Sequence, residues 1–351
     1  QALEISGTAE ANASVEVFIG GNSIGNTTAD GSGNWTYDHT GSSLPEASYS
    51  ITAKATDAAG NESALSGMLN ITIDASAPSV STGTIVGKTY GLTENVDVTY
   101  VFNETVLVDE TNGTPSVTIA MGGQNRAAAY HSGSGTNTLV FRYTTVVGDI
   151  DGNGVSVSAI NTNGGTIQDA AGNDASTSIS VSGAADVRVD TSAPYMSITS
   201  SSNTVSGAFT ATFTFNEDVS GFDLSDISVA NGSAGSFNTT SAKIYTATIT
   251  PVADGNVTVN VAADKAQDAG GNGNTAASEL RVVNDETAPA APVISSISTD
   301  AGSSATDNLT NDQTLEISGT SEANASVEVF IGGNSIGNTT PYWIIAYRGE
   351  P

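Results

Sequence analysis

The chain has 351 residues, with 37 acidic and 9 basic side chains and a formal net charge of −28, although charged residues make up only 13% of it. A sparse charge of one sign repels phosphate backbones and anionic lipid surfaces, which excludes nucleic acid as a partner and leaves divalent cations as the natural counter-ions. There is no cysteine, which excludes disulfides, zinc–thiolate sites and cysteine nucleophiles.

No apolar run approaches the length of a membrane span, so membrane insertion is not expected. The first residues, from Gln1, carry neither a starting Met nor a signal-peptide pattern. We interpret this start as an internal cut from a longer chain.

Period-two alternation of apolar residues predicts strands over 96–102, 138–146, 210–215, 244–250 and 256–263. Clusters of Gly, Asn, Asp and Ser separate these runs, as tight turns require. No window of useful length has a helical period. The pattern predicts an all-β chain of sandwich domains arranged in tandem.

One internal repeat is almost complete. Residues 3–28 recur at 315–340 with a single change, from Ala9 to Ser321. Repeats of this kind indicate an array of similar domains.

A shorter motif, D-x-[ST]-A-P, occurs at 74–78, 190–194 and 285–289, each time after an alternating apolar run. Proline lacks a backbone N–H and disfavours helix in the residue before it, so we interpret each motif as an extended linker. The spacing between the motifs suits one sandwich domain each.

The linkers place domains at 1–73, 79–189 and 195–284, and the truncated N-terminal half of a fourth domain at 290–340. The first domain lacks a counterpart of the stretch that precedes the repeat in the fourth, so we expect its first strand to be missing. The divergent tail 341–351 is interpreted as a truncation or a cloning scar.

Long patterned stretches resemble a known class of repeat. ISGTAEANASVEVFIGGNSIGNTT in the first domain, YHSGSGTNTLVFRYTTVVGDIDGNG in the second and FTFNEDVSGFDLSDISVANGSA in the third are similar to the bacterial Ig-like repeats of large RTX-type and biofilm-associated-protein-type surface adhesins. The resemblance implies all-β, tandem immunoglobulin-like β-sandwich domains in a linear array. It also implies a secreted protein of the bacterial cell surface, with Ca²⁺ at the domain junctions.

Acidic residues recur at one predicted end of each sandwich. Because strand direction alternates, the incoming linker, the B–C loop and the F–G turn share the N-terminal pole of an Ig sandwich. In the second domain these positions hold Asp74 of the linker, Glu104 at the predicted end of strand B, and Asp169 of a D-A-A-G-N turn. We therefore expect the three carboxylates to meet.

The same positions recur in the other domains. The third domain offers Asp190, Glu217 and Asp268, and incomplete sets remain in the first and fourth domains. Those incomplete sets are Glu10 with Asp57 and Asp285 with Glu322.

Three carboxylates at one pole repel one another unless they are neutralised. Ca²⁺ accepts six to eight oxygen ligands in flexible geometry, and Asn173 and Asn272 are expected to add amide oxygens. The alternative is that the D-A-A-G-N segment is only an Asx-capped turn and Asp74 only caps a linker.

Other motifs are weaker. Asp149–Gly154 resembles the start of an EF-hand loop, but Ile160 stands where the bidentate Glu is needed, so we interpret it as the E–F turn of the second domain, with an ion site as the less favoured alternative. Trp35 and Tyr37, at alternate positions, fill a core or else form a carbohydrate-stacking platform.

No catalytic motif stands out, so we do not expect an enzyme. The favoured hypothesis is a non-catalytic extender segment of a secreted adhesin, stiffened by interdomain Ca²⁺ and serving cell adhesion or biofilm formation. Its partners would be calcium ions, neighbouring Ig-like domains, and a surface glycan or a host or biofilm molecule. The alternative is a carbohydrate-binding or spacer module of a secreted polysaccharide-active enzyme.

Overall fold

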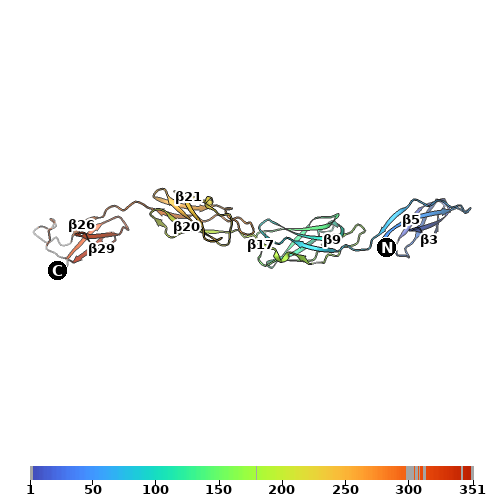
Figure 1. The fold of residues 1–351 in the computed structure, drawn as a ribbon, viewed down its shortest axis with the longest axis horizontal. Helices are drawn as coiled ribbons and strands as arrows, with labels where there is room; N and C mark the ends of the chain where they lie inside the picture. The colour runs from blue at the N-terminus through green and yellow to red at the C-terminus, as the bar shows by residue number, and fades with distance from the viewer. Residues whose placement is uncertain are drawn as a thin grey trace. The chain divides into compact units, whose positions relative to one another are not determined.

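The computed structural model describes residues 3–178, 180–297, 304, 307, 309–310, 314–340 and 343–348. These residues are almost entirely strands and turns, with two short 3₁₀ helices at Ala184–Asp186 and Leu224–Asp226 (Figure 1). The all-β fold predicted from the alternation is confirmed. The chain divides into two compact units, Gln1–Pro194 with Gln267–Asn274 and Tyr195–Ala266 with Thr275–Pro351, and each is described by itself.

The first domain is a sandwich of a two-stranded and a four-stranded sheet. One sheet pairs β1 (Glu4–Thr8) with β4 (Asn34–Asp38). The other has the order β3-β2-β5-β6, with β2 at Ser14–Ile19, β3 at Asn22–Thr28, β5 at Ala47–Thr56 and β6 at Leu69–Ile73. Alternation in β2 turns Val15 and Val17 inward against Trp35, which is buried.

The structure therefore favours the interpretation in which Trp35 and Tyr37 fill a core. Trp35 packs under Gly7, where an added Cβ would lie only 2.6 Å from the indole ring. The Tyr37 hydroxyl donates a hydrogen bond to the carbonyl of Ile24. Both side chains thus serve the packing of this domain.

The second domain contains one large sheet of the order β14-β10-β11-β12-β9-β7-β16, to which β15 adds by pairing with β9, and a smaller sheet β13-β17-β8. The strands are β7 (Val80–Ile85), β8 (Thr89–Tyr90), β9 (Asn95–Asp109), β10 (Ser116–Met121), β11 (Gln124–Ser132), β12 (Thr136–Thr144), β13 (Ile150–Asp151), β14 (Ser156–Val157), β15 (Thr166–Gln168), β16 (Val181–Ser182) and β17 (Arg188–Asp190). The core is aromatic at its centre, where Tyr100 and Phe141 meet edge to face at 5.7 Å.

One boundary differs from the prediction. Glu104 was expected at the end of a strand, but β9 continues to Asp109. The strand continues because it has partners on both sides of Glu104: Asn95–Val101 and Val106 pair with β12, and Leu107–Asp109 pair with β15. Glu104 therefore lies within β9, between its two pairing regions.

The third domain belongs to the second unit and has two four-stranded sheets, ordered β18-β20-β23-β22 and β19-β25-β24-β21. The strands are β18 (Met196–Ser200), β19 (Thr204–Val205), β20 (Phe209–Phe215), β21 (Ile227–Ala230), β22 (Gly232–Thr239), β23 (Ile244–Pro251), β24 (Gly255–Val261) and β25 (Leu280–Asn284). Phe213, Phe222 and Tyr245 form the aromatic centre of its core.

The last part of the second unit has two small sheets, β26-β27-β30 and β28-β29. Their strands are β26 (Val293–Ile297), β27 (Thr314–Thr320), β28 (Val327–Ile331), β29 (Asn334–Thr339) and β30 (Trp343–Arg348). The tail after Thr340 thus supplies a strand. Trp343 pairs with Gly319 as Trp35 pairs with Gly7 in the first domain, so β30 takes the register of β4. The expected origin of the tail stays a prediction.

The EF-hand-like turn is held by protein donors. The Asp149 carboxylate pairs with Arg126 at 2.6 Å and accepts hydrogen bonds from the Tyr143 hydroxyl and the Val146 N–H. Asp151 accepts from three backbone N–H groups, including that of Gly122 at 2.7 Å. Both carboxylates therefore have a structural role in this turn.

The Asp149 network yields a stability prediction. Its side chain is fully buried and its guanidinium partner is 27% exposed. Asp149→Asn leaves Arg126 without its counter-charge, so we expect the second domain to lose roughly 3 kcal/mol of unfolding free energy. Calorimetric unfolding of the whole chain would show one transition shifted to lower temperature.

Asp97→Asn is the matched control, because Asp97 pairs with Arg142 at 2.7 Å but both side chains are about one third exposed. Its loss should be much smaller, since solvent screens the pair. Equal effects of the two substitutions would contradict the structural role assigned to Asp149.

Candidate metal centre

The D-A-[AG]-G-N segments form the same turn three times. In the second domain, the Asp169 carboxylate accepts hydrogen bonds from the N–H groups of Ala171 and Asn173 at 2.8 and 2.9 Å, and from Asn173 Nδ2 at 2.7 Å. The carboxylates of Asp57 and Asp268 accept the equivalent bonds in their own turns. The fourth position is glycine with positive φ each time, as its left-handed backbone requires.

The turn of the second domain also binds the incoming linker. Nδ2 of Asn173 lies 3.2 Å from the carbonyl oxygen of Asp74 and 3.4 Å from that of Ser76. This amide therefore joins the F–G turn to the backbone of the D-x-[ST]-A-P motif. The linker passes the turn at a fixed place, and Asp74 is brought close to Asp169.

The three acids expected at this pole do come together. One carboxylate oxygen from each of Asp74, Glu104 and Asp169 lies within 4.8 Å of the other two. Asp169 is buried, while Asp74 and Glu104 are half-buried. None of the ion pairs within the described residues involves these three carboxylates.

The electrostatics of the cluster are uneven. Desolvation raises the pKa of Glu104, and the charges of Asp74, Asp169 and Glu46 raise it further. Burial acts to raise the pKa of Asp169 as well, but the hydrogen bonds from the side chain and backbone of Asn173 outweigh it and lower that pKa. Asp169 is thus stabilised as an anion, and Glu104 bears the repulsion.

Glu46 was missed in the sequence. It belongs to the first domain, and its Oε2 accepts a hydrogen bond from the Ser76 hydroxyl at 2.7 Å. It therefore reaches the linker next to the three acids. The sequence marks it only as a turn residue, because its approach depends on the course of the linker.

Two asparagines that precede the acids were also missed. Asn103 accepts a hydrogen bond from the N–H of Ser79 at 2.7 Å, and Asn216 accepts one from the N–H of Tyr195 at 2.7 Å. Ser79 and Tyr195 each follow a linker proline directly. The signal that could have revealed them is the recurring Asn-Glu pair at 103–104 and 216–217.

Both amide side chains that were expected to add oxygen ligands have hydrogen-bond partners, and their metal-ligating role stays a prediction. Asn173 turns its Nδ2 toward acceptors only, namely Asp169 and the two linker carbonyls. Oδ1 of Asn272 accepts a hydrogen bond from the N–H of Leu92 at 2.9 Å. Each amide therefore acts as a positioning group between turn and backbone.

The next linker is joined to its turn in the same way. Nδ2 of Asn272 donates to the carbonyl of Asp190 at 2.7 Å and to the Asp268 carboxylate at 2.8 Å. Gly91 lies so close to Gly270 that an added Cβ would be 2.0 Å from the Gly270 carbonyl oxygen. Residues 267–274 accordingly belong to the same compact unit as Asp190.

The remaining predicted acids also have hydrogen-bond partners or line a surface groove. Glu217 follows β20 in the second unit and accepts a hydrogen bond from Asn216 Nδ2 at 3.1 Å. Glu10 and Asp57 line a groove in the first domain. Glu322 accepts a hydrogen bond from the N–H of Ala290 at 3.2 Å, and Asp285 accepts one from the N–H of Thr287.

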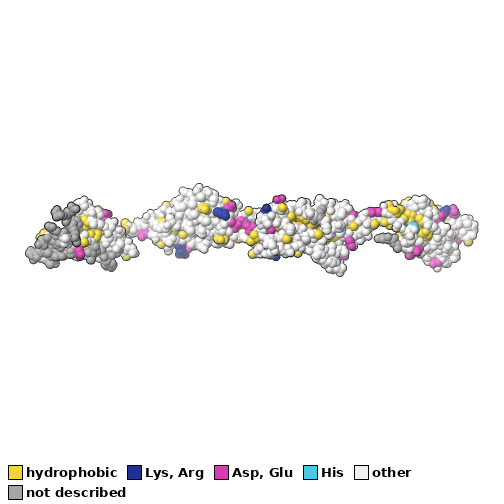
Figure 2. All heavy atoms as spheres, turned by 90° about the horizontal axis from the view of Figure 1, so that it is seen from below, with side chains coloured by type: hydrophobic (Ala, Val, Ile, Leu, Met, Phe, Trp, Pro, Cys, Tyr) yellow, Lys and Arg dark blue, Asp and Glu magenta, His cyan; other side chains and the backbone are white. Residues whose placement is uncertain are grey.

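The comparisons with known proteins agree with the fold. Residues 1–75 and residues 190–283 each match the family model of a bacterial Ig-like domain, and these two segments are bacterial Ig-like domains. The resemblance found in the sequence is thereby confirmed. No curated protein matches the chain. Figure 2 shows that, on the face it displays, basic side chains are few and acidic ones gather in small groups.

Several solved structures are similar at low identity. One concerns the host cell surface retention of a 1.5-MDa bacterial ice-binding adhesin, with 15% identity over 81% of this chain and 88% of that chain, at a TM-score of 0.34. A Ca²⁺-stabilised adhesin of an Antarctic bacterium has 18% identity over 98% and 85%, at 0.33. Invasin, a bacterial integrin-binding protein, has 14% identity over 100% and 76%, at 0.31. Similarity this low says nothing about ligands.

In the part of the chain that the structure describes, no helix is long and apolar enough to cross a bilayer.

Linker capture by Asn173 can be tested without any ion. Asn173→Ala removes the donor to both linker carbonyls, so we expect faster amide hydrogen exchange over residues 75–80. Asn61→Ala is the matched control, because Asn61 makes the same bond to its own Asp57 and no linker bond. Exchange in the 75–80 segment that rises equally in both variants, or in neither, would contradict the capture.

Proposed function

We propose that the chain is a non-catalytic extender segment of a secreted bacterial surface adhesin, and that Ca²⁺ fixes its linkers to the domains that follow them. The observation that carries the proposal is the meeting of Asp74, Glu104 and Asp169 at the point where the linker enters the second domain. One acid comes from the linker, one from a strand and one from the F–G turn. A cation bound there would tie all three elements together.

The ligand chemistry favours calcium. The cluster offers only carboxylate oxygens, and the two histidines of the chain, His39 and His131, are not among its members. Hard oxygen donors without nitrogen or sulfur suit Ca²⁺ or Mg²⁺, and Ca²⁺ tolerates the irregular geometry of ligands drawn from three separate elements. Asp74, Glu104 and Asp169 would hold the ion, which would supply the positive charge that offsets their repulsion.

The effect of such an ion would be mechanical. The linker between the domains is short and contains Pro78, whose ring fixes one backbone angle. Hydrogen bonds from Asn173 already hold the linker carbonyls, but there are only two of them, at 3.2 and 3.4 Å, and the longer one is exposed. An ion shared by linker and domain would restrict the remaining hinge motion, as an extender that holds a binding end away from the cell requires.

The same acidic and amide positions recur at the next linker, which supports the proposal of a calcium site at each junction. Asp190 and Asp268 are joined through Asn272 as Asp74 and Asp169 are joined through Asn173. Glu217 occupies in its sequence the place of Glu104, after the same Phe-Asn pair. A catalytic pair would have no reason to repeat with the linkers.

The alternative is a carbohydrate-binding or spacer module of a secreted polysaccharide-active enzyme. Burial of Trp35 removes the most obvious sugar-stacking platform, so the binding version loses its best candidate. The spacer version would use the same junction mechanics in a different parent protein. A glycan array probed with the chain tests the carbohydrate-binding version. Binding to one glycan class favours the carbohydrate-binding module, and a clean negative favours the extender.

Calcium removal gives the first test. With EDTA we expect a lower melting temperature, and a more compact or more heterogeneous particle in small-angle scattering, because the linker regains its hinge freedom. Re-addition of Ca²⁺ should restore both. If neither quantity responds to Ca²⁺, the stiffening proposal is wrong.

A charge-matched pair of variants locates the ion. Glu104→Gln removes one ligand and one negative charge from the cluster, so we expect Ca²⁺ affinity at this junction to fall by at least about tenfold, which calorimetric titration would measure. Glu110→Gln removes the same charge from an exposed site outside the cluster and should leave the affinity nearly unchanged. Equal losses would point to a diffuse effect of net charge instead.

A further inference from the structure

In each of the first three domains, one turn residue lies opposite the start of the linker that leaves the domain. In the first domain the ladder of β5 and β6 ends with the pair of Ala47 and Ile73. Because these strands are antiparallel, Glu46 lies opposite Asp74, where the linker motif begins. The corresponding end pairs are Ile150 with Asp190 in the second domain and Gly255 with Asn284 in the third. The residues that precede these strands, named here the anchor residues, are Glu46, Asp149 and Asp254.

Two of the anchor residues bind the hydroxyl group of the D-x-[ST]-A-P motif. The Ser76 hydroxyl donates to Oε2 of Glu46 at 2.7 Å. In the third domain, the Thr287 hydroxyl donates to Oδ2 of Asp254 at 2.5 Å, and the N–H of Glu286 donates to Oδ1 at 2.7 Å. The serine or threonine of the motif thus has a partner on the domain that the linker leaves.

The second linker reaches the same turn position in a different way. The Thr191 side chain is buried, and its hydroxyl donates to the backbone carbonyl of Asp149 at 3.0 Å and accepts from the N–H of Gly148 at 3.1 Å. The Asp149 carboxylate is already engaged with Arg126 and Tyr143. The linker therefore bonds to the backbone of this anchor residue, through a hydroxyl one position earlier in the motif.

We propose that the three anchor residues fix each linker to the domain it leaves, without an ion. The hydroxyl bonds continue the last ladder of the domain beyond its final strand pair. In the first linker, Asn173 of the domain that follows holds the backbone of Asp74 and Ser76, so this linker is bonded on both sides. The use of such anchoring rests on the proposed extender function, because a spacer that holds a distant end in place needs linkers that do not swing.

The first anchor also makes Ser76 a positioning residue for the acidic cluster. Besides its hydroxyl bond to Glu46, Ser76 donates its N–H to Oδ1 of Asp74 at 3.1 Å. Asp74 is the linker member of the cluster with Glu104 and Asp169. Ser76 therefore connects the turn of the first domain to the carboxylate that the linker brings to the second.

Thr287 provides matched variants for a test in EDTA, where no cation contributes. Thr287→Val keeps the shape of the side chain but removes the hydroxyl, so hydrogen exchange at the N–H of Glu286 should become roughly fivefold faster. Thr287→Ser keeps the hydroxyl and should exchange as the parent chain does. Asp254→Asn leaves one carbonyl oxygen in place of two carboxylate oxygens and should also speed exchange. Hydrogen exchange followed by mass spectrometry measures all four chains, and equal exchange in the valine and serine variants would overturn the anchor.

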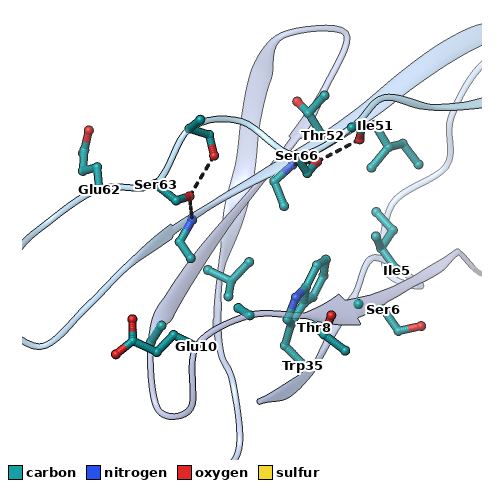
Figure 3. Close-up of a pocket in the computed structure, with 18 of the residues that line it drawn as sticks. Ile5, Ser6, Thr8, Glu10, Trp35, Ile51, Thr52, Glu62, Ser63 and Ser66 are labelled. Carbon is teal, nitrogen blue, oxygen red and sulfur yellow. Dashed lines mark hydrogen bonds between the residues drawn. The ribbon is translucent and has the colours of Figure 1, made fainter.

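Ser76 tests the first linker and its link to the cluster. Ser76→Ala should speed exchange across residues 75–80 roughly fivefold in EDTA. Ser63→Ala is the matched control, because the Ser63 hydroxyl donates to the carbonyl of Ala64 within the first domain at 2.8 Å (Figure 3). Equal exchange over 75–80 in the two variants would overturn this anchor.

A calcium titration of the same two variants tests the positioning role. Ser76→Ala should weaken Ca²⁺ binding at the first junction several-fold in calorimetry, and Ser63→Ala should not. Unchanged affinity in Ser76→Ala would overturn Ser76 as a positioning residue. A parent chain that binds no Ca²⁺ would contradict the proposed function instead, while the exchange measurements in EDTA would still decide whether the anchors exist.

Discussion

At the junction into the second domain, one amide group joins the F–G turn to the linker. Nδ2 of Asn173 is shared between the Asp169 carboxylate and the carbonyl groups of the linker. Because the carboxylate also accepts backbone N–H bonds within the turn, the amide is held in one orientation. The linker is therefore placed by neutral hydrogen bonds, and the position of Asp74 follows from that placement.

Because hydrogen bonds place the linker, the acidic cluster can form although its charges repel one another. The acids are not drawn together by attraction, since like charges at such separations repel one another. They meet because backbone hydrogen bonds fix the turn and the linker, and because β9 carries Glu104 past the same point. The repulsion shows in the raised pKa of Glu104, while Asp169 is protected by its own donors.

The sequence predicted the strands better than their partners. The alternating run 210–215 corresponds to β20 at Phe209–Phe215, since apolar period and burial are local properties. The continuation of β9 past Glu104 depends on β15, a segment almost sixty residues away, and no local pattern contains that information. The hydrogen bond between Asn272 and the N–H of Leu92 could not be predicted for a similar reason. Composition identifies the amide, but only the fold decides that its oxygen meets the N–H of Leu92.

The near-identical repeat shows how far local sequence determines structure. β1 and β27 share the sequence Glu-Ile-Ser-Gly-Thr and pair in the same register with β4 and β30, so the same residues form the same strand twice. Their outer edges nevertheless differ, because β26 covers β27 and no described strand covers β1. Charged or proline residues often protect such an edge, yet Glu4 is the only charged residue of β1 and proline is absent from it. The same residues therefore fold alike in both places, whereas the pairing of their outer edge depends on a strand that lies outside the repeat.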